Sequence, residues 1–376
     1  MAQHYKQAAE VLKNVLQKKS SVKTSIYQND QIKNKKIVLA IVTKTLGNME
    51  MIKELLLSIK DFQQIKQRMM LMVMLNDMIT TGKISGGGQI KQIIMKNKDK
   101  IPRLNADQIE KTQQPTFKWY RLNTLKSTTL PQISNTIEQD TLIPNLYKIS
   151  PPLSTPIDTL LAQDKPSCFP AFILNPPEKS VCIDACAAPG NKTTHLATIM
   201  KNTGLIYAFD KDKKRAELLK SSVNKYKATN IHVIHGDYLA SDPNDPLFNE
   251  VTHILCDPSC SGSGILERQN AQEKHDASRL RMLSSFQKKV VCHSMKFPNV
   301  QRVSYSTCSI NNEENEEVVR AILDENPEFT LENIIPEWPR RGIQIDDKYP
   351  YQYCVRVDPK EDHMTGFFVA LFVKKN

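Results

Sequence analysis

Residues Val181–Thr194 read VCIDACAAPGNKTT, and this stretch decides the fold. An apolar run ends at Asp184, small residues and a Pro-Gly pair follow, and a helical segment begins after them. The small residues let the backbone approach a ligand closely, and the helix offers its N-terminal amide groups to electron-rich groups. A phosphate-binding Walker loop is excluded, because Gly190 is followed by Asn191 before Lys192 is reached.

Predicted strands and helices alternate from this stretch towards the C-terminus. Apolar segments alternate with helical ones such as KKRAELLKSSVNKY and ASRLRMLSSFQKKVVCHSMKF. Such alternation predicts a parallel sheet with helices on both faces and a ligand at the carboxyl ends of its strands. We therefore expect an α/β fold with a mostly parallel sheet of seven strands: SVCIDA, GLIYAFD, IHVIHGD, THILCD, RVSYSTC, CVRVDP and GFFVALFVKK.

Acidic residues stand at several of the predicted strand ends. Asp210 ends the second strand, about twenty residues after the first loop, where a carboxylate commonly accepts hydrogen bonds from ribose hydroxyls. A single acid in this place is often only a solvated turn residue. Because Asp237 and Asp257 repeat the placement, the sequence favours a half-sheet that binds a nucleoside.

The basic charge is concentrated in the N-terminal third. The 376 residues carry a net charge of +11, and residues 1–115 alone hold 20 Lys and Arg against 9 Asp and Glu. This segment is either a polyanion-binding appendage, whose lysines displace counterions from phosphates, or a Lys-rich solvated helical surface. Helical spacing predicts an all-helical domain, over Tyr5–Leu16, Ile37–Val42, Met51–Ile59 and Ile65–Met78.

Two stretches of the helical domain have a structural and a functional interpretation. The Met-rich run RMMLMVMLNDMI is expected to lie in the core. The stretch TGKISGGGQIKQ places three glycines before a basic helix, an arrangement that lets backbone amides approach phosphate. We expect a flexible turn instead, because the Gly-Lys-Ser or Gly-Lys-Thr of a nucleotide-binding loop is missing.

The composition argues against export and membrane insertion. No apolar run approaches the roughly 18 residues of a membrane span, and MAQHYKQAAEVLKN lacks the apolar core of a secretory signal. We expect a protein of the cytosol or nucleus. Its eight cysteines are then expected as thiols that serve catalysis or packing, and the absence of any Cys-x-x-Cys argues against a metal site.

Residues 116–177 differ in composition from the segments on either side. Nine prolines fall in this range, and proline at such a density excludes long helices and central strands. We expect a connecting region with short strands such as FKWYRLNTL. Within it, Trp119, Tyr120 and Arg121 suit either base stacking with phosphate contact or packing, and the pattern does not separate the two.

Two cysteines follow neighbouring strands of the predicted sheet. Cys260 lies in DPSCSGSG after the fourth strand and Cys308 lies in YSTCS after the fifth, so both thiols should face one crevice. Carbon 5 of a pyrimidine accepts a methyl group only after a thiolate has added to carbon 6, and cysteine is suited to this reversible addition. Five other cysteines are expected as small buried hydrophobic residues: Cys168, Cys182, Cys256, Cys292 and Cys354.

The segment NEENEEVVRAIL predicts a helix just after Cys308. Asn311 and Glu314 have the spacing of a helix cap and its partner. A helix N-terminus lowers the pKa of a nearby thiol, although the glutamates of this first turn act against that effect.

The segments DACAAPGNKT, DPSCSGSG and YSTCS, in this order and spacing, resemble the Sun-domain family of S-adenosylmethionine-dependent RNA cytosine-5 methyltransferases. The chain is most similar to member five of the family, the eukaryotic branch acting on large-subunit ribosomal RNA. FKWYRLNTLK, SGGGQIK, QRVSYSTCSINNEENEEVVR and TGFFVALF carry this closer likeness. The resemblance is strong over 165–376 and weaker in the basic N-terminal region, and it implies a Rossmann-like methyltransferase fold.

The resemblance also implies how S-adenosylmethionine binds. Asp210 would hold the ribose, and Arg215 and Asp237 would complete the pocket near the adenine. Asp257 would lie between the methyl donor and the target. The loop around the methionine and ribose parts would comprise Cys186, Ala187, Ala188, Pro189, Gly190, Asn191 and Lys192.

For the reaction itself, the resemblance assigns three residues. Cys308 corresponds to the nucleophile, and Cys260 corresponds to the cysteine that assists release of the methylated base. Asp257 would also hold the cytosine ring by hydrogen bonds. Spacing alone does not decide which thiol has which role.

The expected organisation has three parts. Residues 1–115 form a basic helical domain that binds RNA, 116–177 a shortened RNA-binding subdomain, and 178–376 the catalytic domain. The family carries a longer segment before the Gln-Asp that matches Gln163 and Asp164. Either RNA is held more through the N-terminal helices here, or the sequence has lost residues at this point.

We therefore expect a nucleolar RNA cytosine-5 methyltransferase that acts as a monomer on ribosomal RNA, without a membrane partner and without a metal. An RNA-binding ribosome-assembly factor without activity is the alternative, and the paired thiols with Lys192 and Asp257 argue against it. DNA methylation is disfavoured, because the Thr-Cys at the fifth strand end has no function there.

Overall fold

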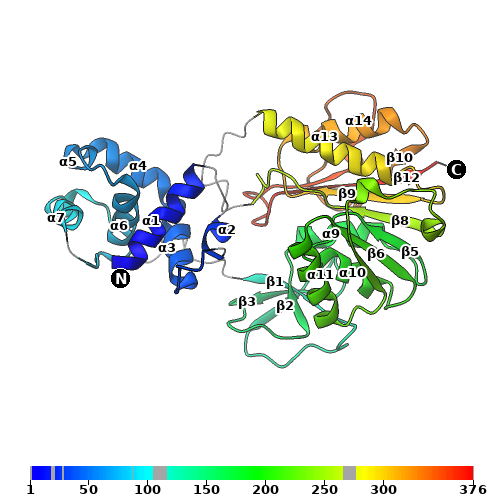
Figure 1. Ribbon diagram of the computed structural model, residues 1–376, viewed down its shortest axis with the longest axis horizontal. Helices are drawn as coiled ribbons and strands as arrows, with labels where there is room; N and C mark the ends of the chain where they lie inside the picture. Colours follow the sequence, from blue (N-terminus) through cyan, green and yellow to red (C-terminus); the bar gives the residue numbers. More distant parts are fainter. Residues whose placement is uncertain are drawn as a thin grey trace. The chain divides into compact units, whose positions relative to one another are not determined.

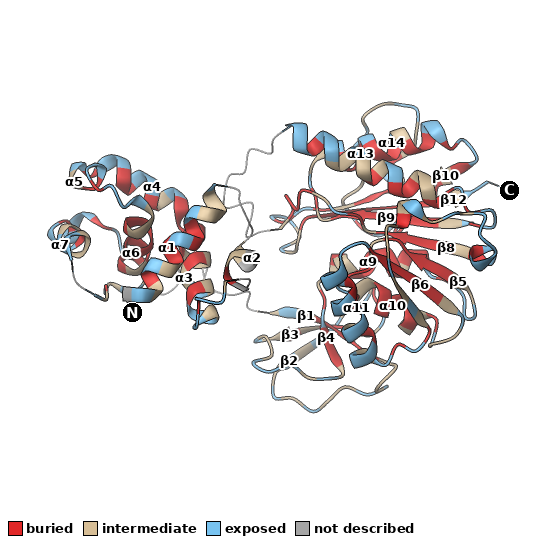
Figure 2. Cartoon of the chain, in the orientation of Figure 1, coloured by how far each residue is buried: buried red, intermediate tan, exposed pale blue. Residues whose placement is uncertain are grey.

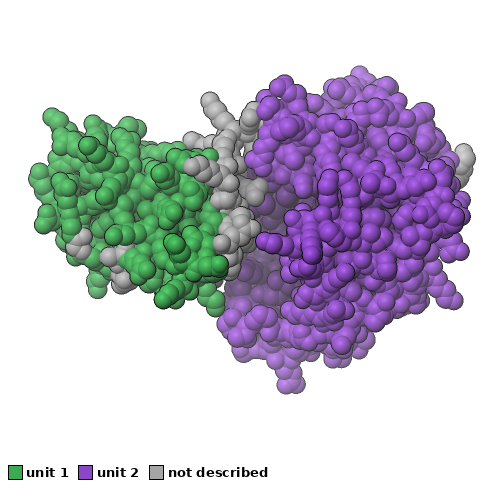
Figure 3. Space-filling model, in the orientation of Figure 1, with its two compact units in different colours: residues 1–114, 267–273 green, residues 115–266, 274–376 purple. Residues whose placement is uncertain are grey.

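The computed structural model describes residues 2–17, 22–27, 29–86, 88–104, 117–265 and 277–375. These residues fall into two compact units, shown in different colours in Figure 3. One unit holds the described residues up to 104, and the other holds those from 117 onward. The expected boundary between 115 and 116 lies outside the described residues. In the described part of the chain, no helix combines the length and apolarity that a membrane span requires.

The N-terminal unit consists of helices in its described residues, as the sequence predicts (Figure 1). Helix α1 packs against α3 and α6 around an apolar core. The Met-rich run lies in α6, and its Met72, Met74 and Met78 are buried in this core, which confirms their expected packing role. The elements are α1 (Ala2–Leu16), α2 (Val22–Tyr27), α3 (Lys35–Gly47), α4 (Met49–Ser58), α5 (Lys60–Gln63), α6 (Arg68–Thr81), α7 (Gln89–Lys96) and the 3₁₀ helix η1 (Lys98–Lys100).

The C-terminal unit contains the expected mixed sheet, with strand order β10-β12-β9-β8-β5-β6-β7 and β11 paired to β12. Its central pairs are parallel, whereas the pairs that involve β12 are antiparallel. The strands are β5 (Val181–Asp184), β6 (Leu205–Asp210), β7 (Ile231–His235), β8 (Val251–Cys256), β9 (Arg302–Thr307), β10 (Phe329–Leu331), β11 (Val355–Val357) and β12 (Phe367–Lys374). The α/β prediction is confirmed.

The path of the chain through the sheet creates the crevice. From β5 the chain runs outward through β6 and β7, and it then returns to β8 on the other side of β5. The carboxyl ends of β5 and β8 therefore point the same way while their connections diverge, which is the place where α/β sheets bind ligands.

Helices cover both faces of this sheet (Figure 1). Because side chains alternate between the faces of a strand, Cys182 lies in one core with Leu196 of α10, and Ile183 lies in the other with Val290 of α13. The central strands are accordingly buried along most of their length (Figure 2). The helices are α9 (Lys165–Leu174), α10 (Asn191–Ile199), α11 (Lys213–Tyr226), α13 (Ala277–Ser294) and α14 (Glu316–Glu325), and the 3₁₀ helices are η2 (Tyr238–Ala240), η3 (Pro246–Phe248), η4 (Asn312–Glu314) and η5 (Tyr351–Tyr353).

The sheet has one strand more than the seven expected. Strand β10 covers Phe329–Leu331 and pairs with β12. This segment was not among the predicted strands, whereas β11, which is equally short, lies within the predicted CVRVDP.

The proline-rich region forms a separate antiparallel sheet with strand order β2-β3-β1-β4. Its strands are β1 (Lys118–Leu122), β2 (Thr136–Gln139), β3 (Leu146–Ser150) and β4 (Leu160–Ala162). Tyr120 and Arg121 of β1 are both buried, so for these two residues packing is the correct alternative. The Arg121 guanidinium is 1% exposed and donates to the side chains of Gln163 and Thr194 and to the carbonyl oxygen of Asn191.

Candidate active site

The loop after β5 is organised by a buried carboxylate. Asp184 is 1% exposed; its Oδ2 accepts a hydrogen bond from the Thr193 hydroxyl at 2.7 Å, and its Oδ1 accepts one from the Cys186 amide at 3.4 Å. Burial raises the pKa of Asp184 to about 7. The carboxyl thus links the end of β5 to the first turn of α10 and sets the path of the loop between them.

This carboxyl gives the protein a pH dependence with a defined sign. In the unfolded chain Asp184 ionises near pH 4, but in the folded chain it ionises near 7, so its contribution to stability is lost as the pH rises through that window. We expect the wild type to lose up to about 1.4 kcal/mol per pH unit relative to Asp184→Asn between pH 4 and 7. Chemical denaturation of both proteins at several pH values measures this difference, and parallel stability curves would contradict it.

Gly190 allows the loop to turn into α10. Its φ is +107°, a conformation that residues with a side chain rarely adopt, and a Cβ there would lie 2.9 Å from Leu219 Cδ1 of α11. Arg215, also on α11, donates to the carbonyl oxygen of Ala188 at 2.7 Å. Helix α11 therefore contacts one side of the expected cofactor loop, and the other side of the loop faces the crevice.

The acids after β6 and β7 are fixed by basic neighbours. Asp210 is buried and lies 3.3 Å from the Arg215 guanidinium. Asp237 accepts from Lys211 at 2.7 Å and from the Leu239 amide at 3.1 Å, and the hydrogen bond from Lys211 lowers the pKa of Asp237. Both carboxylates are thus held in a defined orientation as hydrogen-bond acceptors.

A cavity of about 590 Å³ opens beside Asp237, between the segment after β7 and helix α13. Apolar side chains of Leu239, Met282 and Phe286 form part of its wall, and Lys211 and Arg281 lie at its edge.

An ion pair connects the cofactor loop to the end of β8. Lys192 Nζ lies 2.6 Å from Asp257 Oδ2, and Ser306 of β9 donates to Asp257 Oδ1 at 2.6 Å. Burial acts to lower the pKa of Lys192, but the Asp257 carboxylate outweighs it and raises that pKa. Asp257 is therefore held by α10 and by β9, and 27% of its side-chain surface stays exposed.

The two candidate thiols are in direct contact. Cys260 Sγ lies 3.0 Å from Cys308 Sγ, and both residues are half-buried. The interaction with Cys308, together with burial, raises the pKa of the Cys260 thiol well above its usual range. Cys260 is therefore protonated at neutral pH and can donate its S–H towards Cys308.

The expected helix after Cys308 begins later than the sequence indicates. Residues Asn312–Glu314 form the short η4, and α14 begins only at Glu316. Asn311 makes no side-chain cap bond to the backbone, and Glu314 turns into the protein interior. The predicted cap formed by Asn311 and Glu314 is wrong, because the Glu314 side chain makes its hydrogen bonds in the interior. The effect of a helix N-terminus on the Cys308 thiol stays a prediction.

Sequence patterns missed several residues that support this site. Ser306, Ser261, Gln287 and Glu314 hold Asp257 or the segments around the thiols by hydrogen bonds. Ser306 lies in the quoted YSTCS segment, two residues before Cys308. Because side chains alternate along a strand, this spacing could have predicted that both residues lie on the same face of the sheet. Gln287 lies on α13 and gives no comparable signal. Of the five cysteines expected to be buried, four are, and Cys292 is partly exposed.

Comparison with known proteins identifies relatives of this chain. Residues 171–373 match the family model described as 16S rRNA methyltransferase RsmB/F. The 25S rRNA (cytosine-C(5))-methyltransferase rcm1 of Schizosaccharomyces pombe is 33% identical over 97% of this chain and 90% of its own length. The 28S rRNA (cytosine-C(5))-methyltransferase of Mus musculus is 43% identical over 57% of this chain, and the matched segment spans only 46% of that mouse protein.

Solved structures agree with the fold. The crystal structure of PH0851 has a TM-score of 0.70 at 19% identity and covers 98% of this chain and 99% of that one. The structure of NSun6 from Pyrococcus horikoshii with SFG has a TM-score of 0.56 at 17% identity, over 72% of this chain and 95% of that one.

Proposed function

Because this chain belongs to the RsmB/F family of rRNA methyltransferases, we propose that it methylates carbon 5 of a cytosine in large-subunit ribosomal RNA, with S-adenosylmethionine as methyl donor. The observation that carries this proposal is the contact between the Cys260 and Cys308 sulfurs, at the strand ends next to the Lys192–Asp257 pair. An RNA-binding scaffold has no need of two thiols in contact at a ligand crevice.

The crevice has the hydrogen-bond acceptors and negative charges that this cofactor requires. Carboxylates at Asp210, Asp237 and Asp257 suit ribose hydroxyls, an amino group and the positive charge of a sulfonium. When bound, S-adenosylmethionine supplies an electrophilic methyl group. Asp210 would hold the ribose, and the loop from Cys186 to Lys192 would hold the methionine part. The cavity beside Asp237 would accept the adenine side.

We infer a division of labour between the thiols. The Cys308 sulfur adds to carbon 6 of the cytosine, which makes carbon 5 nucleophilic enough to take the methyl group. Water then takes up the carbon 5 proton, the electron pair of that C–H bond restores the C5–C6 double bond, and the sulfur–carbon bond breaks, which returns the Cys308 thiolate and releases the methylated base. The division itself follows the family resemblance, and the contact between the two sulfurs supports it, because a thiol this close can donate its proton to the departing Cys308 sulfur.

Asp257 would position the cytosine during these steps. Its two oxygens are fixed by Lys192 and Ser306, which come from opposite sides, so the carboxylate presents its remaining acceptor positions in one orientation. Hydrogen bonds from the base to this carboxylate would hold carbon 6 near Cys308.

Methyl transfer into RNA tests the proposal against its alternatives. Purified protein incubated with S-adenosylmethionine and either ribosomal RNA or DNA should form 5-methylcytosine in the RNA alone, as measured by mass spectrometry. Product in neither polymer would favour the assembly factor, and comparable product in DNA would favour a DNA enzyme. A bisulfite map of ribosomal RNA from cells lacking the protein would identify the cytosine.

The ribose contact predicts the effect of one substitution on cofactor binding. Asp210→Ala should weaken binding of S-adenosylmethionine at least about ten-fold, or 1.4 kcal/mol, because the ribose hydroxyls lose a charged acceptor. Isothermal titration calorimetry measures this without RNA. Glu217→Ala, which removes an exposed carboxylate from α11, is the matched control and should bind normally. Equal affinities of the two variants would exclude the ribose contact.

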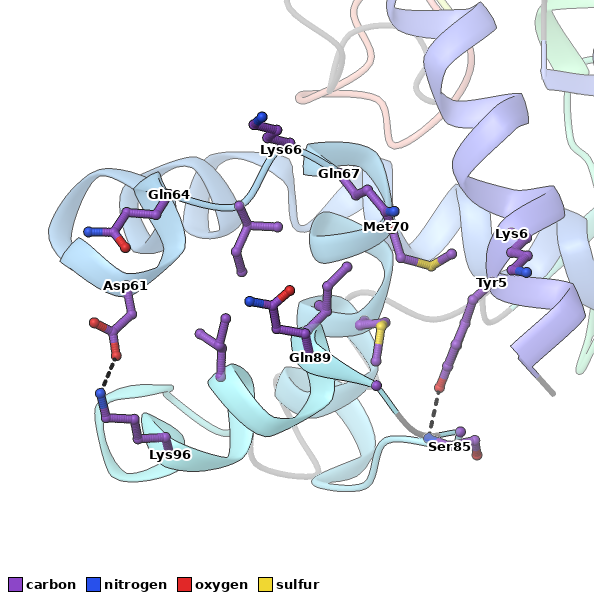
Figure 4. A pocket seen from close by; sticks show the side chains of 16 residues that line it. Tyr5, Lys6, Asp61, Gln64, Lys66, Gln67, Met70, Ser85, Gln89 and Lys96 are labelled. Atoms are coloured by element: carbon purple, nitrogen blue, oxygen red, sulfur yellow. Dashed lines mark hydrogen bonds and ion pairs between the residues drawn. The ribbon is translucent and has the colours of Figure 1, made fainter.

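We further propose that the N-terminal unit binds the RNA backbone. A cavity of about 810 Å³ lies between α1, the α5–α6 connection and α7 (Figure 4). Lys6, Lys66 and Lys96 stand around it, and Ile65 and Ile93 contribute to its apolar wall. Lys96 lies 3.0 Å from Asp61, which also lines the cavity (Figure 4). Lys6 and Lys66, on two other segments, fit a phosphate chain better than they fit a neutral ligand.

Charge reversal tests the RNA contact of this unit. The double variant Lys6→Glu and Lys66→Glu should weaken RNA binding by the full chain and reduce the slope of log affinity against log salt by about 1.5, since each phosphate contact contributes about 0.7–0.9. Filter binding over a salt series measures both quantities. The control Lys53→Glu and Glu54→Lys alters exposed charges on α4 while keeping the net charge. An unchanged slope in the Lys6 and Lys66 variant would exclude this surface.

The relatives named as rRNA methyltransferases also support a place of action in ribosome assembly. We propose the nucleolus as its location and the monomer as its active form. Fluorescence microscopy of the tagged chain and light scattering of the purified protein test these two points.

A further inference from the structure

A buried carboxylate takes part in the hydrogen bonds that join the segments holding the two thiols, beside direct bonds such as that between the Ser263 and Ser309 hydroxyls. Glu314 of η4 is fully buried. Its Oε1 accepts hydrogen bonds from the Ser261 amide at 2.8 Å and the Gln287 side-chain amide at 3.0 Å. Its Oε2 accepts from the Ser261 hydroxyl at 2.5 Å and the Asn311 side-chain amide at 3.4 Å. One side chain thus binds the residue after Cys260 and a residue of the segment after Cys308.

The donors to Glu314 are neutral: a backbone amide, a hydroxyl and two side-chain amides. A buried carboxylate whose donors carry no opposite charge is costly to desolvate. A neutral side chain of similar shape would fill the same space at lower cost. What the carboxyl group supplies beyond packing is acceptors for four donors at once, and these donors lie on the segments next to the thiols and on α13.

The network reaches both residues that flank Cys260. On one side, Ser261 is held by Glu314 through its amide and its hydroxyl. On the other side, Gln287 of α13 donates to the Ser259 carbonyl oxygen at 3.1 Å through the same amide group that contacts Glu314. The Cys260 segment has no regular secondary structure of its own, so these bonds help to fix where its sulfur lies, together with those of Ser263 to Ser309 and Ile310.

Cys308 has anchors that do not pass through Glu314. It follows β9 directly, and β9 is paired on both sides, with β8 and β12. The adjacent Thr307 donates to Asn315 at 2.6 Å. Loss of Glu314 should consequently displace Cys260 more than Cys308.

We propose that Glu314 is a positioning residue that keeps the Cys260 sulfur in contact with Cys308 and so permits release of the methylated base. This inference rests on the proposed function and on the roles assigned to the two thiols. Glu314 acts through Ser261 and Gln287 and touches neither substrate nor cofactor.

The readout that distinguishes positioning from general stability is the covalent RNA adduct. If Cys260 is displaced while Cys308 stays in place, attack on carbon 6 continues but release slows. Glu314→Ala should therefore accumulate an RNA–protein adduct on a denaturing gel, reduce turnover at least ten-fold and bind S-adenosylmethionine as the wild type does. Glu314→Gln preserves the shape and one acceptor oxygen, so a smaller amount of adduct is expected.

Matched variants make the result decisive. Glu313→Ala, which removes the adjacent exposed glutamate, should behave as the wild type. Glu314→Ala combined with Cys308→Ala should give no adduct. Loss of turnover in both Glu314 variants without adduct, while Cys260→Ala does form one, would overturn the positioning role and leave the proposed function intact. If Cys260→Ala forms no adduct either, the assigned roles of the thiols fail. Should Glu314→Ala melt below the assay temperature, Glu314→Gln decides.

Discussion

Cys308→Ala is expected to abolish formation of 5-methylcytosine in RNA. Without the sulfur, carbon 6 has no nucleophile, and carbon 5 stays too weakly nucleophilic to take the methyl group. A barrier raised by only 4 kcal/mol lowers the rate about 10³-fold, so the product should fall below detection in a standard assay. Mass spectrometry of nucleosides from treated RNA measures the loss.

The control for this prediction is Cys292→Ala. Cys292 is another partly exposed thiol, but it lies on α13 and contacts Glu325 and Asn326 instead of the crevice. Cys292→Ala should keep wild-type turnover. Both variants should bind S-adenosylmethionine equally, since neither thiol belongs to the cofactor loop. Undiminished methylation by Cys308→Ala would refute the assigned nucleophile.

Cys260→Ala is expected to trap a covalent complex between the protein and RNA. The Cys308 sulfur can still attack, but the protonated thiol that lies 3.0 Å away and assists its departure is gone. A denaturing gel with labelled RNA should show a band of retarded mobility that the wild type shows weakly or not at all.

The band should depend on the other thiol. Adding Cys308→Ala to Cys260→Ala should remove it, which shows that the adduct forms through Cys308. A gel without the band, together with normal turnover by Cys260→Ala, would exclude the release role for Cys260.

The strand-and-helix part of the fold could be predicted from the sequence because its signals are local. KKRAELLKSSVNKY begins and ends where α11 does, and each acid singled out lies at or just after the end of a strand. Strand β10 was not predicted, whereas β11, which is equally short, lies within the predicted CVRVDP. The sheet formed by β1 to β4 was expected only as short strands, since no pattern in the sequence shows which of these strands pair.

The candidate site, like the fold, could be predicted only in part. That Cys260 and Cys308 face one crevice could be inferred from their positions after neighbouring strands, and the structure places their sulfurs in contact. The ion pair joins Lys192 of α10 to Asp257 after β8, and no spacing in the sequence predicts it. Glu314 has the spacing of a capping partner, but its side chain enters the interior, because four donors there outweigh the one backbone amide that a cap would satisfy.

Arg121 determines where the chain can be cut without damage. Its guanidinium ties the small sheet to the first turns of α10 through Asn191 and Thr194. A fragment that begins at 178, at the expected boundary of the catalytic domain, would lack this cation and also α9, whose Phe169 is fully buried. Such a fragment would expose apolar surface and leave buried acceptors unsatisfied beside the cofactor loop. The smallest piece that keeps the loop intact should therefore include β1, so the proline-rich region is an integral part of the methyltransferase and not a removable linker.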